Sequence, residues 1–217
     1  MKQPVFALID CNNFFVSCMR VFRPDLKDRP VVALSSNDGC VVARSNEAKA
    51  LGIPMGAPVF KWRQFFKSNN VMQFSGNFEL YGDMSRRIVG ICTSITPHTE
   101  VYSVDESFLD LSELNISNLT TWGQEVKKRI MQWTGIPVSI GIAGSKTLAK
   151  LASERAKKDN KHRGVLDLYS LNKKERRPFL DETPIKDVWG IGWRLTPKLQ
   201  AEQLFTASHV ADLLPRY

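Results

Sequence analysis

The sequence lacks the residue groupings from which structural metal sites and disulfide frameworks are usually built. Its 217 residues include four cysteines and three histidines. The cysteines form no CxxC pair and no zinc-binding spacing, and the histidines are scattered along the chain. We therefore expect free, buried thiols in a reducing compartment. This pattern argues against a structural metal and against a small disulfide-stabilised domain.

Long hydrophobic runs are also missing. No segment approaches the roughly 18 apolar residues that a membrane span needs. The first residues lead directly into a strand-like apolar run, without the polar spacer and small-residue cleavage site of a signal peptide. Internal repeats and low-complexity segments are likewise missing. We expect a cytoplasmic globular protein with no membrane partner, long enough for one sizeable core and a smaller domain or two.

Basic residues outnumber acidic residues, and the excess is unevenly distributed along the chain. The formal net charge is +8, and residues 145–217 hold 15 Lys and Arg against 9 Asp and Glu, a balance of +6. The first 144 residues therefore contribute only +2. A basic C-terminal third beside a nearly neutral body suggests a polyanionic partner such as nucleic acid. The alternative is a basic face that only contacts solvent.

Hydrophobic periodicity predicts the main elements. It indicates strands at 5–10 and 135–143, long helices at 77–95 and 117–133, and a hairpin at 101–111. Without an inserted segment, the order is strand, helix, strand, strand, helix, strand. This order is typical of the ferredoxin-like split βαβ fold, an α+β fold with an antiparallel sheet and helices on one face. In such a sheet we expect the first strand and the first strand of the hairpin to lie side by side at the centre.

The inserted segment and the C-terminal third have their own patterns. Strands at 29–34 and 39–44 and two short helices predict a small α/β unit. Arg44 and Lys49 lie near the start of its first helix, which favours phosphate binding. After Ser145, we expect a helix at 146–158 with outward-facing lysines, a strand at 164–168 and a helical region at 172–214.

Three carboxylates stand at the ends of predicted strands. Asp105 and Glu106 are adjacent at the tip of the hairpin, and Asp10 ends the first strand. Two neighbouring negative charges repel each other unless a cation lies between them. The split βαβ plan lets Asp10 approach the other two, which favours a shared cation site. The alternatives are a solvated Asp-Glu turn and a structural Asp10 that caps the helix predicted after Asn12 and Asn13.

Five segments together carry a resemblance to a known family. They are residues 10–17 (DCNNFFVS), 46–53 (NEAKALGI), 102–110 (YSVDESFLD), 141–150 (GIAGSKTLAK) and 188–192 (VWGIG). Each segment is weak alone, but in this order and spacing they resemble the Y-family translesion DNA polymerases. The resemblance is greatest to the UmuC type, the catalytic subunit of bacterial DNA polymerase V.

The resemblance implies a set of domains. It predicts a catalytic palm from residues 1–25 and 78–165, fingers from 26–77, and a helical thumb with a helix-hairpin-helix from 166–217. Family members continue into a little-finger domain that grips duplex DNA. We therefore expect a chain that is truncated after the thumb, with the thumb incomplete and the little finger absent, and with severely weakened template binding and processivity.

The resemblance also implies residue roles. It assigns Asp10, Asp105 and Glu106 as catalytic, and these three with Cys11 (through its carbonyl) as ligands of two Mg²⁺ ions. Phe15 corresponds to a steric gate that excludes a ribose 2′-hydroxyl, whereas Phe14 fits a core position. The nucleotide-binding set implied is Asn13, Phe14, Phe15, Arg44, Asn46, Lys49 and Lys157. Asn46 departs from the family, in which a triphosphate-binding tyrosine is common.

DNA binding is implied for Lys146, Lys150 and the turn Gly190-Ile191-Gly192. The turn resembles a helix-hairpin-helix that holds a DNA phosphate through its backbone N–H groups; a simple helix-ending turn is the alternative.

The function implied is error-prone translesion DNA synthesis in DNA repair and the SOS response. The expected substrates are primer-template DNA and deoxynucleoside triphosphates. The expected partners are a UmuD-type regulatory subunit, a recombinase filament and a sliding clamp. Two alternatives remain at this point. One is a nucleotidyl cyclase on the same palm plan, and the other is a weak or inactive fragment that binds DNA or a polymerase partner.

Overall fold

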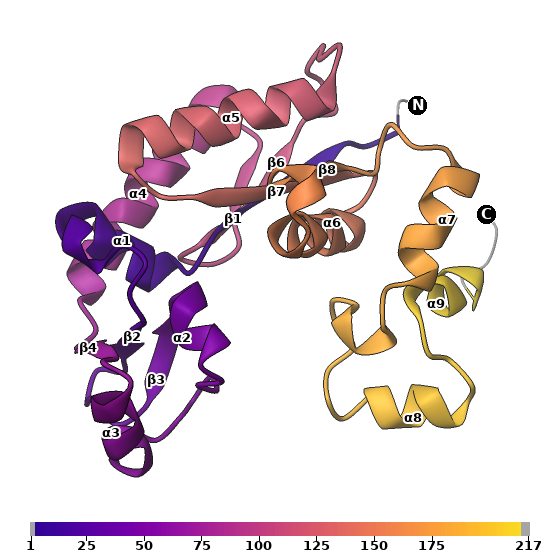
Figure 1. The fold of residues 1–217 in the computed structure, drawn as a ribbon. Coiled ribbons are helices and arrows are strands. Elements are labelled where there is room, and N and C mark those ends of the chain that lie inside the picture. The colour runs from indigo at the N-terminus through magenta and orange to yellow at the C-terminus, as the bar shows by residue number, and fades with distance from the viewer. Residues whose placement is uncertain (1–2, 214–217) are drawn as a thin grey trace. The chain divides into compact units, whose positions relative to one another are not determined.

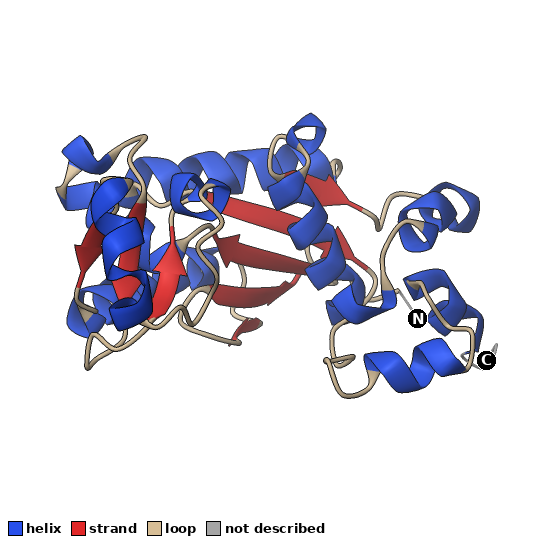
Figure 2. Cartoon of the chain, turned by 60° about the horizontal axis from the view of Figure 1, so that its bottom comes forward, coloured by secondary structure: helices blue, strands red, loops and turns tan. Residues whose placement is uncertain are grey.

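A computed structural model describes residues 3–213 of the chain (Figure 1). The strands are β1 Phe6–Cys11, β2 Val31–Leu34, β3 Val41–Arg44, β4 Met72–Phe74, β5 Thr99–Val101, β6 Glu106–Asp110, β7 Val138–Ala143 and β8 Val165–Asp167. The α-helices are α1 Phe14–Phe22, α2 Asn46–Ala50, α3 Val59–Ser68, α4 Phe78–Ile95, α5 Leu119–Thr134, α6 Lys146–Lys158, α7 Lys173–Asp181, α8 Thr196–Ala201 and α9 Ala207–Leu213. Figure 2, coloured by secondary structure, shows that the chain contains both strands and helices.

The larger sheet follows the predicted split βαβ plan. Its strand order is β5-β6-β1-β7-β8. Without the inserted segment, the chain runs β1, α4, β5, β6, α5, β7, and the first four strands of the sheet have the ferredoxin-like order. The predicted α+β fold class is therefore confirmed, and β8 adds a fifth strand parallel to β7.

One expected strand neighbour was wrong. The neighbour of β1 is β6, the second strand of the hairpin, rather than β5, the first. β6 is apolar at Phe108 and Leu109, both of which are buried. β5 is short and mostly exposed, with the burial pattern of an edge strand. The more hydrophobic hairpin strand therefore takes the central place.

The inserted segment forms a second sheet with its own core. The strand order is β3-β2-β4, with β2 antiparallel to β3 and parallel to β4. β4 was not anticipated from the sequence, because three residues carry almost no periodicity. Buried apolar side chains of this sheet and its helices form the core: Val32, Leu34, Val41, Ala48, Ile53, Ala57, Phe66 and Val71.

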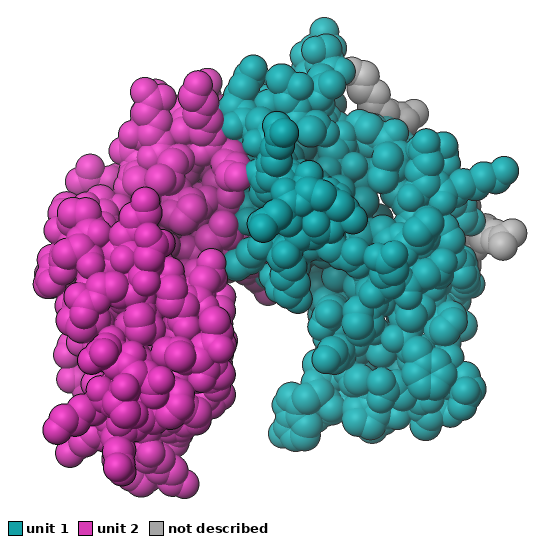
Figure 3. Space-filling model, in the orientation of Figure 1, with its two compact units in different colours: residues 1–9, 108–125, 139–217 teal, residues 10–107, 126–138 magenta. Residues whose placement is uncertain are grey.

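The chain divides into two compact units, coloured separately in Figure 3. Unit 1 comprises residues 1–9, 108–125 and 139–217, and unit 2 comprises residues 10–107 and 126–138. Strands β1, β6 and β7 each contain a boundary between the units. The boundaries predicted for the palm, fingers and thumb lie at other residues, and they stay a prediction.

Local side chains fix several helix starts at the predicted places. The Asn77 carboxamide oxygen accepts the Leu80 N–H at the start of α4. The hydroxyl oxygens of Ser45 and Ser145 accept the N–H groups of Ala48 and Leu148. Such contacts satisfy backbone donors that have no partner within the helix. Asn13 is different: it precedes α1 but its side chain makes no capping hydrogen bond.

The C-terminal part of unit 1 is built from short helices. Asn172 and Glu175 form a capping box at the start of α7. Arg177 of α7 forms ion pairs with Asp181 and with Asp212 of α9. These contacts hold α7 and α9 together after β8.

The predicted free thiols are confirmed. Cys11, Cys18 and Cys92 are buried and Cys40 is half-buried, and none of the four forms a disulfide. Burial raises the pKa of Cys92 to about 12, so this thiol stays protonated near neutral pH. Across residues 3–213, the structure has no helix of the length and apolarity needed to cross a membrane.

Candidate active site

A backbone hydrogen bond joins the two segments that carry Asp10 and Asp105. The Cys11 N–H donates to the Asp105 carbonyl oxygen over 2.9 Å, and the Asn12 N–H donates to the Pro137 carbonyl oxygen over 2.8 Å. The end of β1 is thereby tied to the β5–β6 connection on one side and to the segment before β7 on the other. All of these residues belong to unit 2.

Ser103 shapes the turn that presents the adjacent acids. Its hydroxyl donates to Asp105 Oδ1 over 2.7 Å and accepts the Glu106 N–H over 3.0 Å. Asp105 lies in the connection, and Glu106 is the first residue of β6. Both side chains are half-buried, as is Asp10. The hairpin therefore presents the acids at its tip, as the sequence predicted.

The electrostatics of Cys11 reflect the nearby carboxylates. Burial, and then the negative charges of Asp10 and Asp105, raise the pKa of the Cys11 thiol well above its usual range. Two strand ends that are far apart in sequence thus bring two carboxylates near one buried thiol. The thiol therefore stays protonated near neutral pH.

The donor chemistry of this region fits Mg²⁺, a hard ion that prefers carboxylate and carbonyl oxygens. Asp10, Asp105, Glu106 and the Cys11 carbonyl would supply only such oxygens. Among residues 3–213, however, no three His, Cys, Asp or Glu side chains are gathered closely enough to hold a metal ion. The donor types fit, whereas the three carboxylates are not assembled into one cluster.

The two aromatic residues that follow Asn13 lie in different surroundings. Phe14 is buried, with 3% of its surface exposed, as expected for a core residue. Phe15 is half-buried, and its ring stacks on Tyr81 of α4 with the centroids 4.2 Å apart and the planes 9° from parallel. The ring of Phe78 meets Phe15 edge-on at 6.0 Å. Phe15 is therefore held from one side while part of its surface stays accessible.

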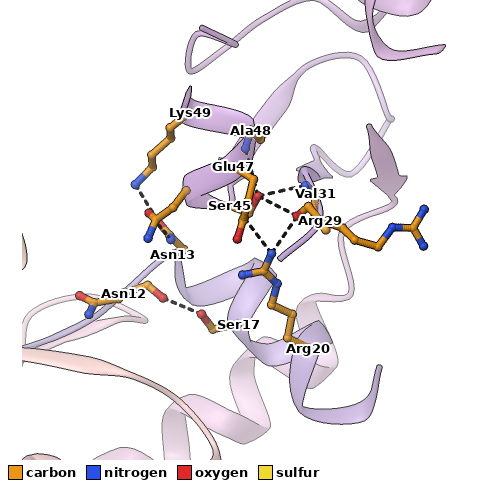
Figure 4. A network of polar contacts seen from close by, with 11 residues as sticks. Asn12, Asn13, Ser17, Arg20, Arg29, Val31, Ser45, Glu47, Ala48 and Lys49 are labelled. Atoms are coloured by element: carbon orange, nitrogen blue, oxygen red, sulfur yellow. Dashed lines mark hydrogen bonds and ion pairs between the residues drawn. The ribbon is translucent and has the colours of Figure 1, made fainter. Parts of the chain in front are cut away.

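Asn13 links the start of α1 to helix α2 (Figure 4). Its Nδ2 donates to Asn46 Oδ1 over 2.9 Å, and its Oδ1 accepts a hydrogen bond from Lys49 Nζ over 2.6 Å. Asn46 and Lys49 are exposed, and Asn13 is half-buried. Three of the residues predicted to bind nucleotide thus form one polar chain that solvent can reach.

A second group of contacts braces the same two elements (Figure 4). Arg20 of α1 forms an ion pair with Glu47 of α2 at 2.8 Å and donates to the Arg29 carbonyl oxygen. The Ser45 hydroxyl oxygen accepts the Val31 N–H. Arg44, also predicted to bind nucleotide, donates from Nη1 to the Ile53 carbonyl oxygen over 2.6 Å. In this arrangement Arg44 supports the chain that follows α2.

The remaining predicted residues belong to unit 1. Lys146 was expected to face outward, but it is half-buried, with Nζ 5.5 Å from the centre of the Phe108 ring and 6.0 Å from that of Phe6. That expectation was wrong because the start of α6 lies over aromatic side chains, which attract a cation. Lys150 and Lys157 are also half-buried.

The Gly190-Ile191-Gly192 turn follows a short 3₁₀ turn at Ile185–Asp187 and precedes α8. Gly190 has a φ of 91°, a conformation that suits glycine. The ring of the preceding Trp189 stacks on Phe108 at 5.9 Å. This aromatic contact anchors the turn to β6.

Sequence reasoning missed Tyr81, Ser103 and Arg20. Ser103 could have been identified from the sequence, because a serine two residues before an acid is typical of a turn that the serine side chain stabilises. Tyr81 and Arg20 carry no such signal, because their partners are distant in the sequence. Tyr81 contacts Phe15, 66 residues away, and Arg20 contacts Glu47, 27 residues away.

Comparisons with known proteins give consistent results. Residues 9–154 match the model of the impB/mucB/samB family. The chain is 46% identical to Protein UmuC of Salmonella typhimurium over 96% of this chain and 49% of that protein. It is 31% identical to DNA polymerase IV 1 of Halalkalibacterium halodurans over 100% of this chain and 51% of that protein. The chain thus spans about half the length of the curated relatives it matches.

The comparison with solved structures agrees with the sequence comparison. The crystal structure of DinB from Sulfolobus solfataricus matches with a TM-score of 0.82 at 26% identity, over 97% of this chain and 60% of the other. An insertion ternary complex of Dbh DNA polymerase matches with a TM-score of 0.80 at 27% identity, over 93% of this chain and 58% of the other.

Proposed function

The chain belongs to the impB/mucB/samB family, and we propose that it carries the catalytic part of a translesion DNA polymerase. The observation that carries the proposal is the hydrogen bond from the Cys11 N–H to the Asp105 carbonyl oxygen. This bond joins the segments of Asp10 and Asp105, the carboxylates at matching positions of the family motifs. Template-directed nucleotidyl transfer is the reaction that this pair and the neighbouring phosphate-binding side chains suit best.

The reaction is a phosphoryl transfer. The primer 3′-oxygen attacks the α-phosphorus of a deoxynucleoside triphosphate, a new phosphodiester bond forms, and pyrophosphate leaves with the electron pair of the broken bond. The hydroxyl proton passes to solvent. Such a reaction needs positioning and charge compensation rather than a protein nucleophile, which agrees with a site that offers carboxylates and no reactive thiolate. Two Mg²⁺ ions, when bound by Asp10, Asp105, Glu106 and the Cys11 carbonyl, supply charge compensation at the attacking and leaving oxygens.

The other residues of the chain select and hold the substrates. The Phe15 ring presses against the sugar and excludes a 2′-hydroxyl. Asn46 and Lys49 hold the triphosphate, and Lys157 of unit 1 is proposed separately as a phosphate contact. Lys146, Lys150 and the turn at Gly190 hold DNA phosphates without reading bases, since contacts to phosphates carry no sequence information directly.

The wider role is part of the same proposal. Family membership suggests error-prone copying past lesions in DNA repair and the SOS response, in the cytoplasm. It also suggests a UmuD-type regulatory subunit, a recombinase filament and a sliding clamp as partners. The described residues provide no observation that favours a nucleotidyl cyclase.

Primer extension with Mg²⁺ on undamaged and abasic templates tests the proposal. We expect extension by the wild-type chain and a rate below about one hundredth of it for Asp105→Asn, because the amide removes a negative charge from the site. Asp28→Asn is the matched control: Asp28 is exposed, and its φ of 57° is one that asparagine tolerates.

Three results would contradict the proposal. DNA binding without any extension would identify a non-catalytic DNA-binding fragment. Undiminished extension by Asp105→Asn would exclude this carboxylate from the chemistry. A cyclic product from a nucleoside triphosphate, formed without template, would identify a cyclase.

A further inference from the structure

Asn13 occupies the N-cap position of α1 without acting as a cap. Its φ of 49° and ψ of 43° place it in the left-handed region, which asparagine tolerates better than most residues. An N-cap residue usually has an extended backbone and directs its side-chain oxygen at the helix. The left-handed backbone of Asn13 instead accompanies a side chain that reaches α2, as Figure 4 shows.

The two contacts of Asn13 fix the orientation of its amide. A lysine ammonium has only N–H donors, so the group of Asn13 that faces Lys49 Nζ at 2.6 Å must be the carbonyl oxygen. The amino group of Asn13 then faces Asn46, 2.9 Å from its Oδ1. Lys49 thereby fixes the orientation of the Asn13 amide.

The same logic extends to the next amide in the chain. Because Asn13 donates, Asn46 must present its carbonyl oxygen to Asn13, and its own amino group is directed elsewhere. Both amide oxygens are used within the chain of contacts. What Asn46 and Lys49 offer to a ligand is therefore N–H donors and one positive charge, at exposed positions. Such a surface suits the oxygens of a phosphate group.

We propose that Asn13 is a positioning residue, which orients the Asn46 amide and the Lys49 ammonium as joint donors to the phosphates of the incoming nucleotide. The nature of the ligand rests on the proposed function; the orientation rests on the hydrogen bonds alone. The Asn46 amide has a donor side and an acceptor side, so a second group is needed to set its direction.

Phosphate binding by the whole chain in the absence of DNA tests the inference. The probes are inorganic tripolyphosphate and dATP, with the dissociation constant measured by calorimetry. Asn13→Gly removes the amide while keeping a residue that adopts a left-handed backbone at no steric cost. We expect a dissociation constant about fivefold higher for both probes, the size of one net hydrogen bond.

Asn70→Gly is the matched control, because Asn70 also has a left-handed backbone, with a φ of 51°, but is exposed and lies after α3, away from Asn46 and Lys49 in the sequence. It should bind both probes as the wild type does. Urea unfolding of each variant establishes that the fold is intact.

A double-mutant cycle separates orientation from a general change at the start of α1. If Asn13 acts in part through Asn46, Asn13→Gly should raise the dissociation constant less in an Asn46→Ala background than in the wild type, and what remains is its effect through Lys49. Additive effects, or binding by Asn13→Gly as tight as the wild type or tighter, would overturn the inference, as would a wild-type chain that binds neither probe. Because these measurements need no template, a chain that fails to extend primers but shows the coupling would refute only the polymerase function.

Discussion

At the residue scale, the ring of Phe15 offers the sharpest test of substrate choice. Its contacts with Tyr81 at 4.2 Å and Phe78 at 6.0 Å hold the ring in place, so it can act as a wall against a 2′-hydroxyl. We predict that Phe15→Ala raises incorporation of ribonucleotides relative to deoxynucleotides by about 10- to 100-fold, the range in which removal of a steric group changes selectivity. Single-nucleotide insertion with matched ribo- and deoxynucleoside triphosphates measures the ratio.

Phe14→Leu is the control for this prediction. Phe14 is buried in the core, so shortening it should lower stability without changing the sugar preference. An unchanged ratio in Phe15→Ala, or an equal change in Phe14→Leu, would refute the assignment of Phe15 as the steric gate.

Single residues also show where sequence reasoning reached its limit. The positions of Asp10 and Asp105 at the ends of their segments followed from strand patterns, because burial and alternation are local properties. The direction of the Asn13 side chain did not follow, because asparagine before a helix normally caps it. Its actual partners, Asn46 and Lys49, lie 33 and 36 residues away. Long-range polar partners of this kind leave no periodic trace in a sequence.

At the element scale, the packing of α6 on β7 depends on one glycine. A Cβ atom on Gly141 would overlap the Ala149 carbonyl oxygen and the Ser153 backbone nitrogen, both in α6. Backbone atoms cannot move aside as a flexible side chain can. We predict that Gly141→Ala lowers the free energy of unfolding by about 3 kcal/mol, at the upper end of the usual cost of overpacking. Urea denaturation measures this loss.

Gly144, three residues further along the chain, provides the matched substitution. A Cβ there would meet its nearest neighbours, the Pro4 carbonyl oxygen and the Tyr169 ring, at 3.8 and 3.9 Å, which is ordinary contact. Gly144→Ala should therefore unfold at nearly the wild-type urea concentration. Equal stability of the two variants would show that α6 does not pack as closely on β7 as the structure indicates.

The elements themselves were largely predictable, and their pairing was less so. The long helices α4 and α6 begin where Asn77 and Ser145 indicated, because capping is decided by neighbouring residues. Whether β5 or β6 lies beside β1 depends on contacts between distant segments, and the first assignment was wrong. The three residues of β4 were missed for the same reason, since the strand is defined by pairing with β2.

At the scale of the whole molecule, the basic segment and the three predicted catalytic carboxylates belong to different units. The basic segment 145–217 lies within unit 1, whereas Asp10, Asp105 and Glu106 lie in unit 2. The proposed function thus assigns the DNA backbone to lysines of unit 1 and the reacting carboxylates to unit 2. The sequence indicated the charge asymmetry, but it gave no sign of where the compact units divide, because these boundaries pass through continuous strands.

The salt dependence of DNA binding tests the role of unit 1. Each lysine that neutralises a phosphate releases bound counterions, so the logarithm of the affinity falls with the logarithm of the salt concentration. We predict that Lys150→Gln weakens binding to primer-template DNA of any sequence and reduces the magnitude of this slope by about 1.

Lys61→Gln is the control: Lys61 lies on α3 in unit 2, exposed and close to the Phe60 ring. Fluorescence anisotropy across a salt series measures both slopes. Since the slope counts phosphate contacts whatever the base sequence, an unchanged slope in Lys150→Gln, or an equal change in Lys61→Gln, would exclude Lys150 from the DNA contact.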